Sequence, residues 1–409
     1  MSMFDGFKAT RANDADSSGA GGAAGRPPRV PRNRRWLLPI AVMACLASAG
    51  VGPASAAAPT PAAILQAGAQ QGITDGYPGV IGLVRQGDTA QYVHAGVGDL
   101  STKVPADPKA KFRIGSNTKA FTAAVLLQLE GEQRLSLDDT VARWLPGAVN
   151  ANGYDGTKIT VRQLLNHTSG LPEYADSTQV SVPYLLNTNP RQTWAPQTLV
   201  DIALSRHAPD AVPGQKFSYA NTNYVLAGMV IKAVTGADAA TEIQQRIIEP
   251  LGLHDTSFPT ADPALYGTYL RGYLHPVTFF TQDVTASNVQ VYGSAGAMVS
   301  TLDDLATFSR ALLTGQLLAP AQMAELKTTV PANSSGTAAY GLGVQHLQLP
   351  CGQWGWGHTG AVLGYLSNWL TSEDGTKQVL HATNEFHLIG GTRGQLDTAK
   401  AAVDAFCAM

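Results

Sequence analysis

The strand-like segments of this 409-residue chain lie toward the two ends of its folded part, and helical patterns fill the middle. Residues 79–100 show two apolar strands around a polar turn, and further strand patterns run through residues 340–383. Between them, over about 135–311, apolar helical segments alternate with Gly, Pro and Asn clusters. We therefore expect an α+β fold, with an antiparallel sheet built from the N- and C-terminal parts, flanking helices and a mostly helical inserted lobe. An active site would lie at the lobe boundary.

The first 56 residues have the pattern of a signal peptide. An arginine-rich segment precedes an apolar run, residues 36–51, and small residues follow up to Ala56. The apolar run is interrupted by Pro39 and Gly50 and is shorter than the roughly 20 residues that span a bilayer. We expect cleavage after Ala56 and no membrane span in the mature chain; a retained membrane anchor is the alternative.

The mature chain, residues 57–409, is expected to be secreted or periplasmic. The pair Arg34-Arg35 before the apolar run fits both Sec and twin-arginine export, so the export route stays open. Lipid attachment at Cys45 is a further alternative, which "VMAC" supports poorly because the apolar run continues beyond the cysteine.

Cleavage would change both the charge and the cysteine count of the chain. It would remove seven of the 28 Lys and Arg residues and three of the 30 Asp and Glu residues, which leaves 21 against 27 and a formal net charge of −6. This balance gives no indication of a nucleic-acid partner. Cys351 and Cys407 would be left as an even pair in an oxidising compartment, and we predict that they form a disulfide. Closing that loop would stabilise the fold by about 4 kcal/mol; two unrelated buried thiols are the alternative.

The stretch "FRIGSNTKAF", residues 112–121, places Ser116 three residues before Lys119 at the start of a helix. The helix that follows is apolar on nearly every side, so we expect it to lie between other layers, with both side chains directed toward the lobe boundary. A buried lysine near a serine either stays charged and supports a deprotonated neighbour or loses its proton and serves as a base. Taken alone, the spacing is also compatible with Ser116 as a helix cap and Lys119 on the surface.

Two later segments carry polar side chains that suit the same cleft. "KFSYANTNYVLAGM" contains Tyr219 and Asn221 just before an apolar helix, where a tyrosine hydroxyl can reach a cleft. "WGWGHTGAVLGY" contains His358 and Thr359 in an apolar, glycine-rich strand, where a polar pair needs partners. Each segment alone is more often structural, with a packed tyrosine, a capping asparagine and a satisfied histidine.

Together, the order Ser-x-x-Lys, Tyr-x-Asn and His-Thr-Gly resembles the penicillin-recognising serine hydrolases, which include DD-peptidases, class C β-lactamases and related esterases. The spacing is 100 residues from Lys119 to Tyr219 and 139 from there to His358. The resemblance covers nearly all of the mature chain. It looks closest to secreted D-alanyl-D-alanine carboxypeptidases of peptidase family S12.

The resemblance implies a role for each of these residues. Ser116 would be the nucleophile, and Lys119 and Tyr219 would share the general acid and base work. Asn221 would contact Lys119 and the substrate amide. His358 would support Tyr219.

The third motif would hold the substrate. Thr359 would bind it, and the backbone N–H groups of Ser116 and Ala361 would form the oxyanion hole. Losing one such donor typically costs about 3 kcal/mol, so Gly360 and a regular strand matter as much as side chains. His358 stands where many relatives have Lys, and we expect it to titrate near neutral pH.

The substrate is less constrained than the mechanism. A carboxypeptidase must hold a terminal carboxylate, but Ala361 has no hydroxyl where such relatives have Thr, and Gln345 and His346 stand where they have Arg. We expect a D-Ala-D-Ala carboxypeptidase that acts on cell-wall peptides through an acyl-enzyme on Ser116. The alternatives are an esterase or other amide hydrolase, a class C-like β-lactamase and a non-catalytic penicillin-binding module.

The sequence contains none of three rival signatures: a Gly-x-Ser-x-Gly elbow, a His-Glu-x-x-His pair or a Gly-rich phosphate loop. The nine histidines show no ligand spacing, so we expect no metal and no cofactor. His167 is interpreted as structural, and Trp354 and Trp356 as strand packing, with substrate stacking as the alternative for the two tryptophans. The expected partners are a small peptide or ester substrate and β-lactams, as acylating inhibitors or substrates, and we expect a monomer.

Overall fold

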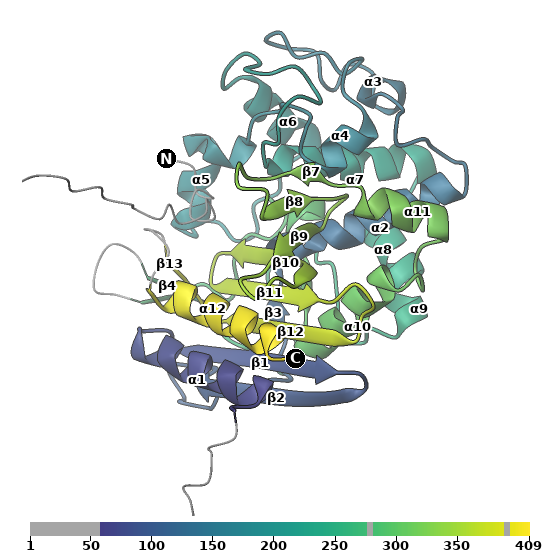
Figure 1. The fold of residues 1–409 in the computed structure, drawn as a ribbon. Helices are drawn as coiled ribbons and strands as arrows, with labels where there is room; N and C mark the ends of the chain where they lie inside the picture. Colours follow the sequence, from purple (N-terminus) through teal and green to yellow (C-terminus); the bar gives the residue numbers. More distant parts are fainter. Residues whose placement is uncertain (1–57, 276–280, 388–392) are drawn as a thin grey trace, which may run out of the picture. The chain divides into compact units, whose positions relative to one another are not determined.

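The structure is a computed structural model that describes residues 58–275, 281–387 and 393–409 (Figure 1). The predicted signal peptide, with its arginine pair and Cys45, lies outside the described residues. Across the described ranges, none of the helices combines the length and the apolar character that crossing a membrane requires.

An eight-stranded antiparallel sheet is built from both ends of the chain, as expected (Figure 1). The junction between the two ends is the pairing of β1 with β12, in which Leu83 lies opposite Leu380. In spatial order the strands are β2 (Thr89–Gly96), β1 (Gly79–Gln86), β12 (Lys377–Thr383), β11 (Tyr365–Thr371), β10 (Trp354–Val362), β9 (Gln345–Gln348), β8 (Ala338–Tyr340) and β7 (Val330–Pro331).

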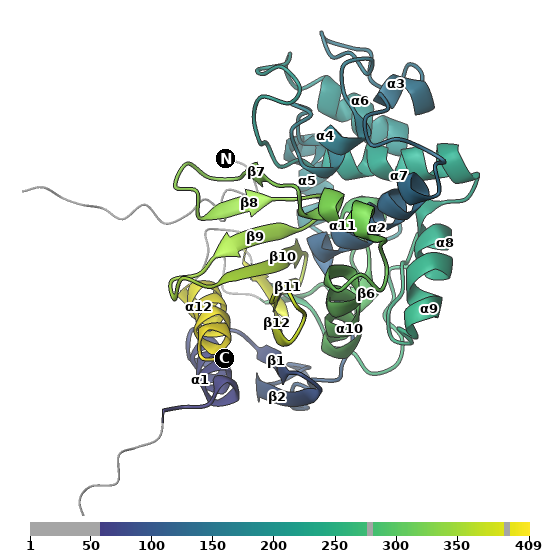
Figure 2. The same ribbon diagram turned by 45° about the vertical axis from the view of Figure 1, so that its right-hand side comes forward.

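Helices cover both faces of this sheet. Successive side chains of a strand point to opposite faces, and β12 shows this directly. Val379 packs with α1 (Pro61–Thr74) and α12 (Arg393–Cys407), whereas Leu380 belongs to the main core with α2 (Thr118–Gly131) and α10 (Leu302–Leu313). Figure 2 shows the two helical layers on opposite sides of the sheet.

The first and last helices pack against each other through small residues. A Cβ on Gly68 of α1 would lie 2.1 Å from the Cβ of Ala401 on α12, so a larger residue at Gly68 would push the helices apart. Cys407, the last residue of α12, forms the expected disulfide with Cys351 in the turn before β10, and their Cα atoms are 5.9 Å apart. The disulfide therefore ties the end of the chain to the sheet.

The chain between α2 and β7 contains the helical lobe together with short strands. Its helical segments are α3 (Val141–Trp144), α4 (Val161–Leu165), η3 (Tyr174–Asp176), α5 (Thr178–Leu185), α6 (Pro196–Leu204), α7 (Asn221–Thr235), α8 (Ala239–Ile243), η4 (Gln244–Ile248), α9 (Glu249–Leu251), η5 (Gly293–Ala295), α10 and α11 (Pro320–Lys327). Its short strands are β4 (Tyr273–His275) and β5 (Gln282–Asp283), which join β13 (Glu385–His387), and β6 (Val299–Ser300), which pairs with β3 (Phe112–Arg113). Although α10 falls within the predicted lobe, it packs on the sheet.

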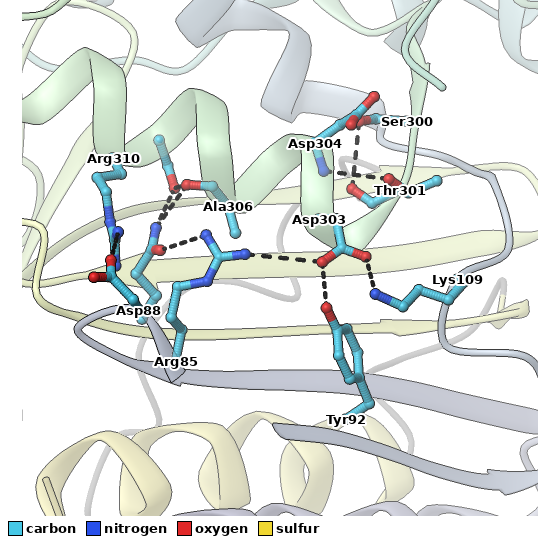
Figure 3. A network of polar contacts seen from close by, with 12 residues as sticks. Arg85, Asp88, Tyr92, Lys109, Ser300, Thr301, Asp303, Asp304, Ala306 and Arg310 are labelled. Carbon is cyan, nitrogen blue, oxygen red and sulfur yellow. Dashed lines mark hydrogen bonds and ion pairs between the residues drawn. The ribbon is translucent and has the colours of Figure 1, made fainter. Parts of the chain in front are cut away.

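A network of charged side chains fastens α10 to the edge of the sheet (Figure 3). Asp303, in the first turn of α10, accepts hydrogen bonds from the Tyr92 hydroxyl and from Lys109 Nζ, the latter at 2.8 Å, and lies 3.8 Å from Arg85. An acidic side chain at this end also favours the helix dipole. Lys109 is 54% exposed and Asp303 30%, so water screens the pair.

Candidate active site

Ser116 lies in a short 3-10 turn, η2 (Gly115–Asn117), between β3 and α2. Its side chain is buried, and neither η2 nor α2 begins with a side-chain capping hydrogen bond. Ser116 is therefore not the helix cap that the spacing alone would also allow.

Glycines let the nucleophile turn touch β10 backbone to backbone. Gly115 has a φ of +53°, which disfavours other residues, and a Cβ there would lie 2.8 Å from the nitrogen of Ala361. A Cβ on Gly360 would lie 2.0 Å from the carbonyl oxygen of Ile114. The turn that carries Ser116 thus lies beside Ala361, the second donor that the expected oxyanion hole requires.

Lys119 is fully buried, and its amine meets three acceptors. Nζ lies 3.0 Å from Ser116 Oγ, 2.7 Å from Asn221 Oδ1 and 2.8 Å from the carbonyl oxygen of Ala295. The three N–H groups of an ammonium match these acceptors. A neutral amine would keep the bonds to Asn221 and Ala295 and turn its lone pair toward Ser116, so this geometry lets Lys119 take the serine proton.

Glu173 is a buried carboxyl group close to this lysine, and the sequence did not single it out. Its two oxygens accept the backbone N–H groups of Asn221, at 2.5 Å, and of Ala175, at 2.8 Å. Burial lowers the pKa of Lys119 toward neutral pH, and the charge of Glu173 opposes that decrease. Burial likewise raises the pKa of Glu173. Asn221 links the two groups, because its backbone N–H donates to Glu173 and its side-chain oxygen accepts from Lys119.

Tyr219 and Asn221 flank the start of α7, as the sequence predicted. The Tyr219 hydroxyl hydrogen-bonds Ser116, and Lys119 Nζ lies 4.8 Å from the centre of the tyrosine ring. Burial holds the pKa of Tyr219 well above its usual value. The phenol therefore stays protonated at neutral pH, and Lys119 is the better proton acceptor of the two.

The amide nitrogen of Asn221 is available to a substrate. Its Oδ1 accepts from Lys119, whereas its Nδ2 is buried and has no hydrogen-bond partner among the described residues. A substrate carbonyl placed over Ser116 would supply the missing acceptor.

His358 is buried in β10 and differs from the expectation. Its Nδ1 lies 2.6 Å from the carbonyl oxygen of Thr359, which can only accept, so Nε2 accepts the hydroxyl of Tyr340 at 2.8 Å. Burial lowers the pKa of His358 to about 3. The prediction that it titrates near neutral pH is therefore wrong. Its ring centre is 6.4 Å from that of Tyr219, and Tyr340 packs edge-on against Tyr219 at 6.2 Å.

The accessible side of the third motif carries neutral groups. Thr359 and Ala361 alternate with buried neighbours and are partly exposed. On the adjacent strand β9, Gln345 pairs with Gly357, and His346 stacks on Trp356 with ring centres 4.0 Å apart. Burial also lowers the pKa of His346, so neither residue offers a cation.

Sequence reasoning undervalued two further neighbours of the site. His167, interpreted as structural, is fully buried and its ring centre is 4.2 Å from that of Tyr219. The hydroxyl of Tyr340 hydrogen-bonds His358, and no sequence motif marks this tyrosine. In the ranges that the structure describes, no three His, Cys, Asp or Glu side chains come together as metal ligands.

Comparison with known proteins agrees with this geometry. The family model described as Beta-lactamase matches residues 62–399, so the chain belongs to this family. Penicillin-binding protein 4* of Bacillus subtilis is 28% identical over 315 residues, which cover 74% of this chain and 67% of that protein. The protein is thus a serine hydrolase of the β-lactamase and penicillin-binding superfamily.

Two solved structures with the same fold are amide hydrolases by name. A D-stereospecific amidohydrolase from Streptomyces sp. is 36% identical, with a TM-score of 0.78 over 84% of this chain and 98% of that one. The D-amino acid amidase from Ochrobactrum anthropi SV3, in complex with L-phenylalanine amide, is 27% identical, with a TM-score of 0.71 over 83% and 97%.

Proposed function

We propose that the protein is an exported, monomeric serine amidohydrolase that cleaves an amide bond of a D-amino acid derivative. The observation that carries this proposal is that the positions at and beside the third motif, Thr359 and Ala361 in β10 and Gln345 and His346 in β9, include no arginine or lysine. A free terminal carboxylate is usually bound by an arginine or by several hydroxyl groups. An uncharged substrate amide carries no carboxylate and needs no such partners. The named activity of the 36% identical Streptomyces structure supports the same substrate class.

The arrangement supports a two-step reaction. Ser116 Oγ attacks the substrate carbonyl as Lys119 takes the serine proton, and the backbone N–H groups of Ser116 and Ala361 stabilise the oxyanion. Tyr219 then gives a proton to the departing nitrogen as the C–N bond breaks. The Tyr219 phenolate then takes a proton from a water molecule, which attacks the resulting ester, and Lys119 returns its proton to Ser116 Oγ as the ester bond breaks.

D-Ala-D-Ala carboxypeptidase activity is the second candidate. The similarity to penicillin-binding protein 4* supports it, and the same nucleophile, base and acid would serve. It would require the peptide carboxylate to be held without a cation from Gln345 or His346.

A comparison of kcat/KM on four substrates tests the proposal. They are D-phenylalaninamide, L-phenylalaninamide, an acyl-D-Ala-D-Ala peptide and a short-chain nitrophenyl ester, with Ser116→Ala as the control. We expect the D-amide to be hydrolysed faster than its L-enantiomer and than the peptide. Turnover of the peptide alone would establish the carboxypeptidase instead, and turnover of the ester alone would establish an esterase.

A further inference from the structure

We propose that His167 is a positioning residue that fixes the catalytic Tyr219 through both its backbone and its neutral imidazole. The inference rests on the proposed function, because it assumes that Tyr219 takes part in the reaction at Ser116. It assigns a task to a histidine that the sequence interpretation treated as structural.

The backbone N–H groups of both residues that flank Tyr219 are bonded to His167. The carbonyl oxygen of His167 accepts the N–H of Ser218 at 2.8 Å, and its Nδ1 accepts the N–H of Ala220 at 3.2 Å. His167 follows the end of α4 with a φ of +59°, a left-handed conformation that histidine and asparagine adopt more readily than most residues. This conformation lets one residue use its backbone and its ring on the same neighbouring turn.

The protonation state of the ring follows from its partners. Besides the Ala220 N–H, Nδ1 lies 3.0 Å from Asn223 Nδ2, and Ser169 donates to Asn223 Oδ1 at 2.5 Å, which turns the amide nitrogen toward the histidine. Because Nδ1 receives two donors, it carries no proton, and the single proton is on Nε2. Burial lowers the pKa of His167 well below its usual value, so the imidazole stays neutral.

The ring also supports the face of the tyrosine. It packs on Tyr219 with 4.2 Å between ring centres and an angle of 31°, and it meets Tyr340 edge-on at 4.9 Å. Nε2 is buried without a hydrogen-bond partner in the described part of the chain, so its N–H lies among aromatic rings. The charged or titratable groups that face it are Lys119 from α2, His358 from β10 and Tyr224 from α7, together with these two tyrosines.

Contacts of this kind determine where the phenol hydroxyl lies relative to Ser116. A catalytic group displaced by about 1 Å loses roughly 100-fold in rate. A residue that only stabilises the fold would change the melting temperature without separating kcat from KM. The two roles therefore give different kinetics.

The test compares His167→Asn and His167→Phe with the control His381→Phe, on the best amide substrate of the wild type. Asn keeps an acceptor near the Nδ1 position and tolerates positive φ, whereas Phe keeps the ring and loses the acceptor. His381 is another buried histidine with a lowered pKa, on β12 in the sheet. We expect kcat to fall about 10- to 100-fold in the Phe variant and less in the Asn variant. KM should stay within about twofold and the control should be unaffected.

Folded Phe and Asn variants with wild-type kcat would overturn the proposal, as would equal losses in all three variants. If the Phe variant does not fold, His167→Ala replaces it, and Asn must then keep a higher kcat than Ala. If the wild type hydrolyses no amide, the proposed function fails by itself. The His167 variants are then compared by their rate of Ser116 acylation by a penicillin. We expect the slowest acylation in the Phe variant, faster acylation in the Asn variant and the wild-type rate in the control.

Discussion

Two clusters in this protein each combine a lysine with a carboxylate, but they differ in burial and therefore in the pKa values of these groups. In the network of Figure 3, Lys109 and Asp303 bond directly at 2.8 Å and remain partly exposed. At the active site, Lys119 and Glu173 are buried and are linked through Asn221. Exposed ion pairs contribute little to folding stability, and both partners keep their charges. Burial instead moves the pKa values of Lys119 and Glu173 toward each other, which makes proton transfer from Ser116 to Lys119 accessible.

Removing the amine of Lys119 should have the largest effect on activity. Lys119→Met keeps much of the side-chain volume and removes the base, so we expect kcat/KM to fall by about 1000-fold or more. Circular dichroism would establish that the variant is folded. Activity within tenfold of the wild type would show that Lys119 is not the base.

Gly360→Ala should come next, because the added Cβ would lie 2.0 Å from the carbonyl oxygen of Ile114. Pushing β10 away from the nucleophile turn disturbs the oxyanion donors, and we expect a loss of about 100-fold in kcat together with about 1–3 kcal/mol in stability. Gly131→Ala at the end of α2 is the control, since it meets only the flexible side chain of Gln322. Equal kinetics in the two variants would argue against close contact at Gly360.

Glu173→Gln should shift the pH dependence of kcat/KM without abolishing activity. The amide can still accept the Asn221 N–H, but the negative charge that favours protonated Lys119 is gone. The pKa of Lys119 should then decrease, and the limb of the kcat/KM profile that reports Lys119 should move to lower pH. The matched control is Asp303→Asn in the exposed network. An unmoved limb, or a move to higher pH, would contradict the coupling.

Asp303→Asn should itself have the smallest effect. Asp303 and its partner Lys109 are partly exposed to water, so we expect a stability change of about 1 kcal/mol or less. The difference should shrink as salt is added, and kcat/KM should not change. A loss of activity would mean that the edge of the sheet is coupled to the site.

The sequence predicted the fold because strand patterns at both chain ends leave few ways to close one sheet. It also brought together Ser116, Lys119, Tyr219 and Asn221, whose order and spacing carry the family resemblance. Residues that matter through contacts between distant segments were harder to find. Glu173 acts on Asn221, 48 positions later, and His167 on the turn around Tyr219.

His358, in the third motif, is another residue whose properties depend on contacts that the sequence does not reveal. A motif does not reveal that His358 is buried or that it accepts the hydroxyl of Tyr340, and these contacts make it neutral. The one hint that the sequence offered was "NHTSGLPEY", residues 166–174, where polar side chains follow an apolar helix closely. Both His167 and Glu173 belong to this segment.

Serine acylation is the central claim, and intact-protein mass spectrometry after exposure to a penicillin tests it most directly. We expect one adduct on the wild type, located at Ser116 by peptide mapping, none on Ser116→Ala and slow formation on Lys119→Met. No adduct on the wild type, or an equal adduct on Ser116→Ala, would contradict the account.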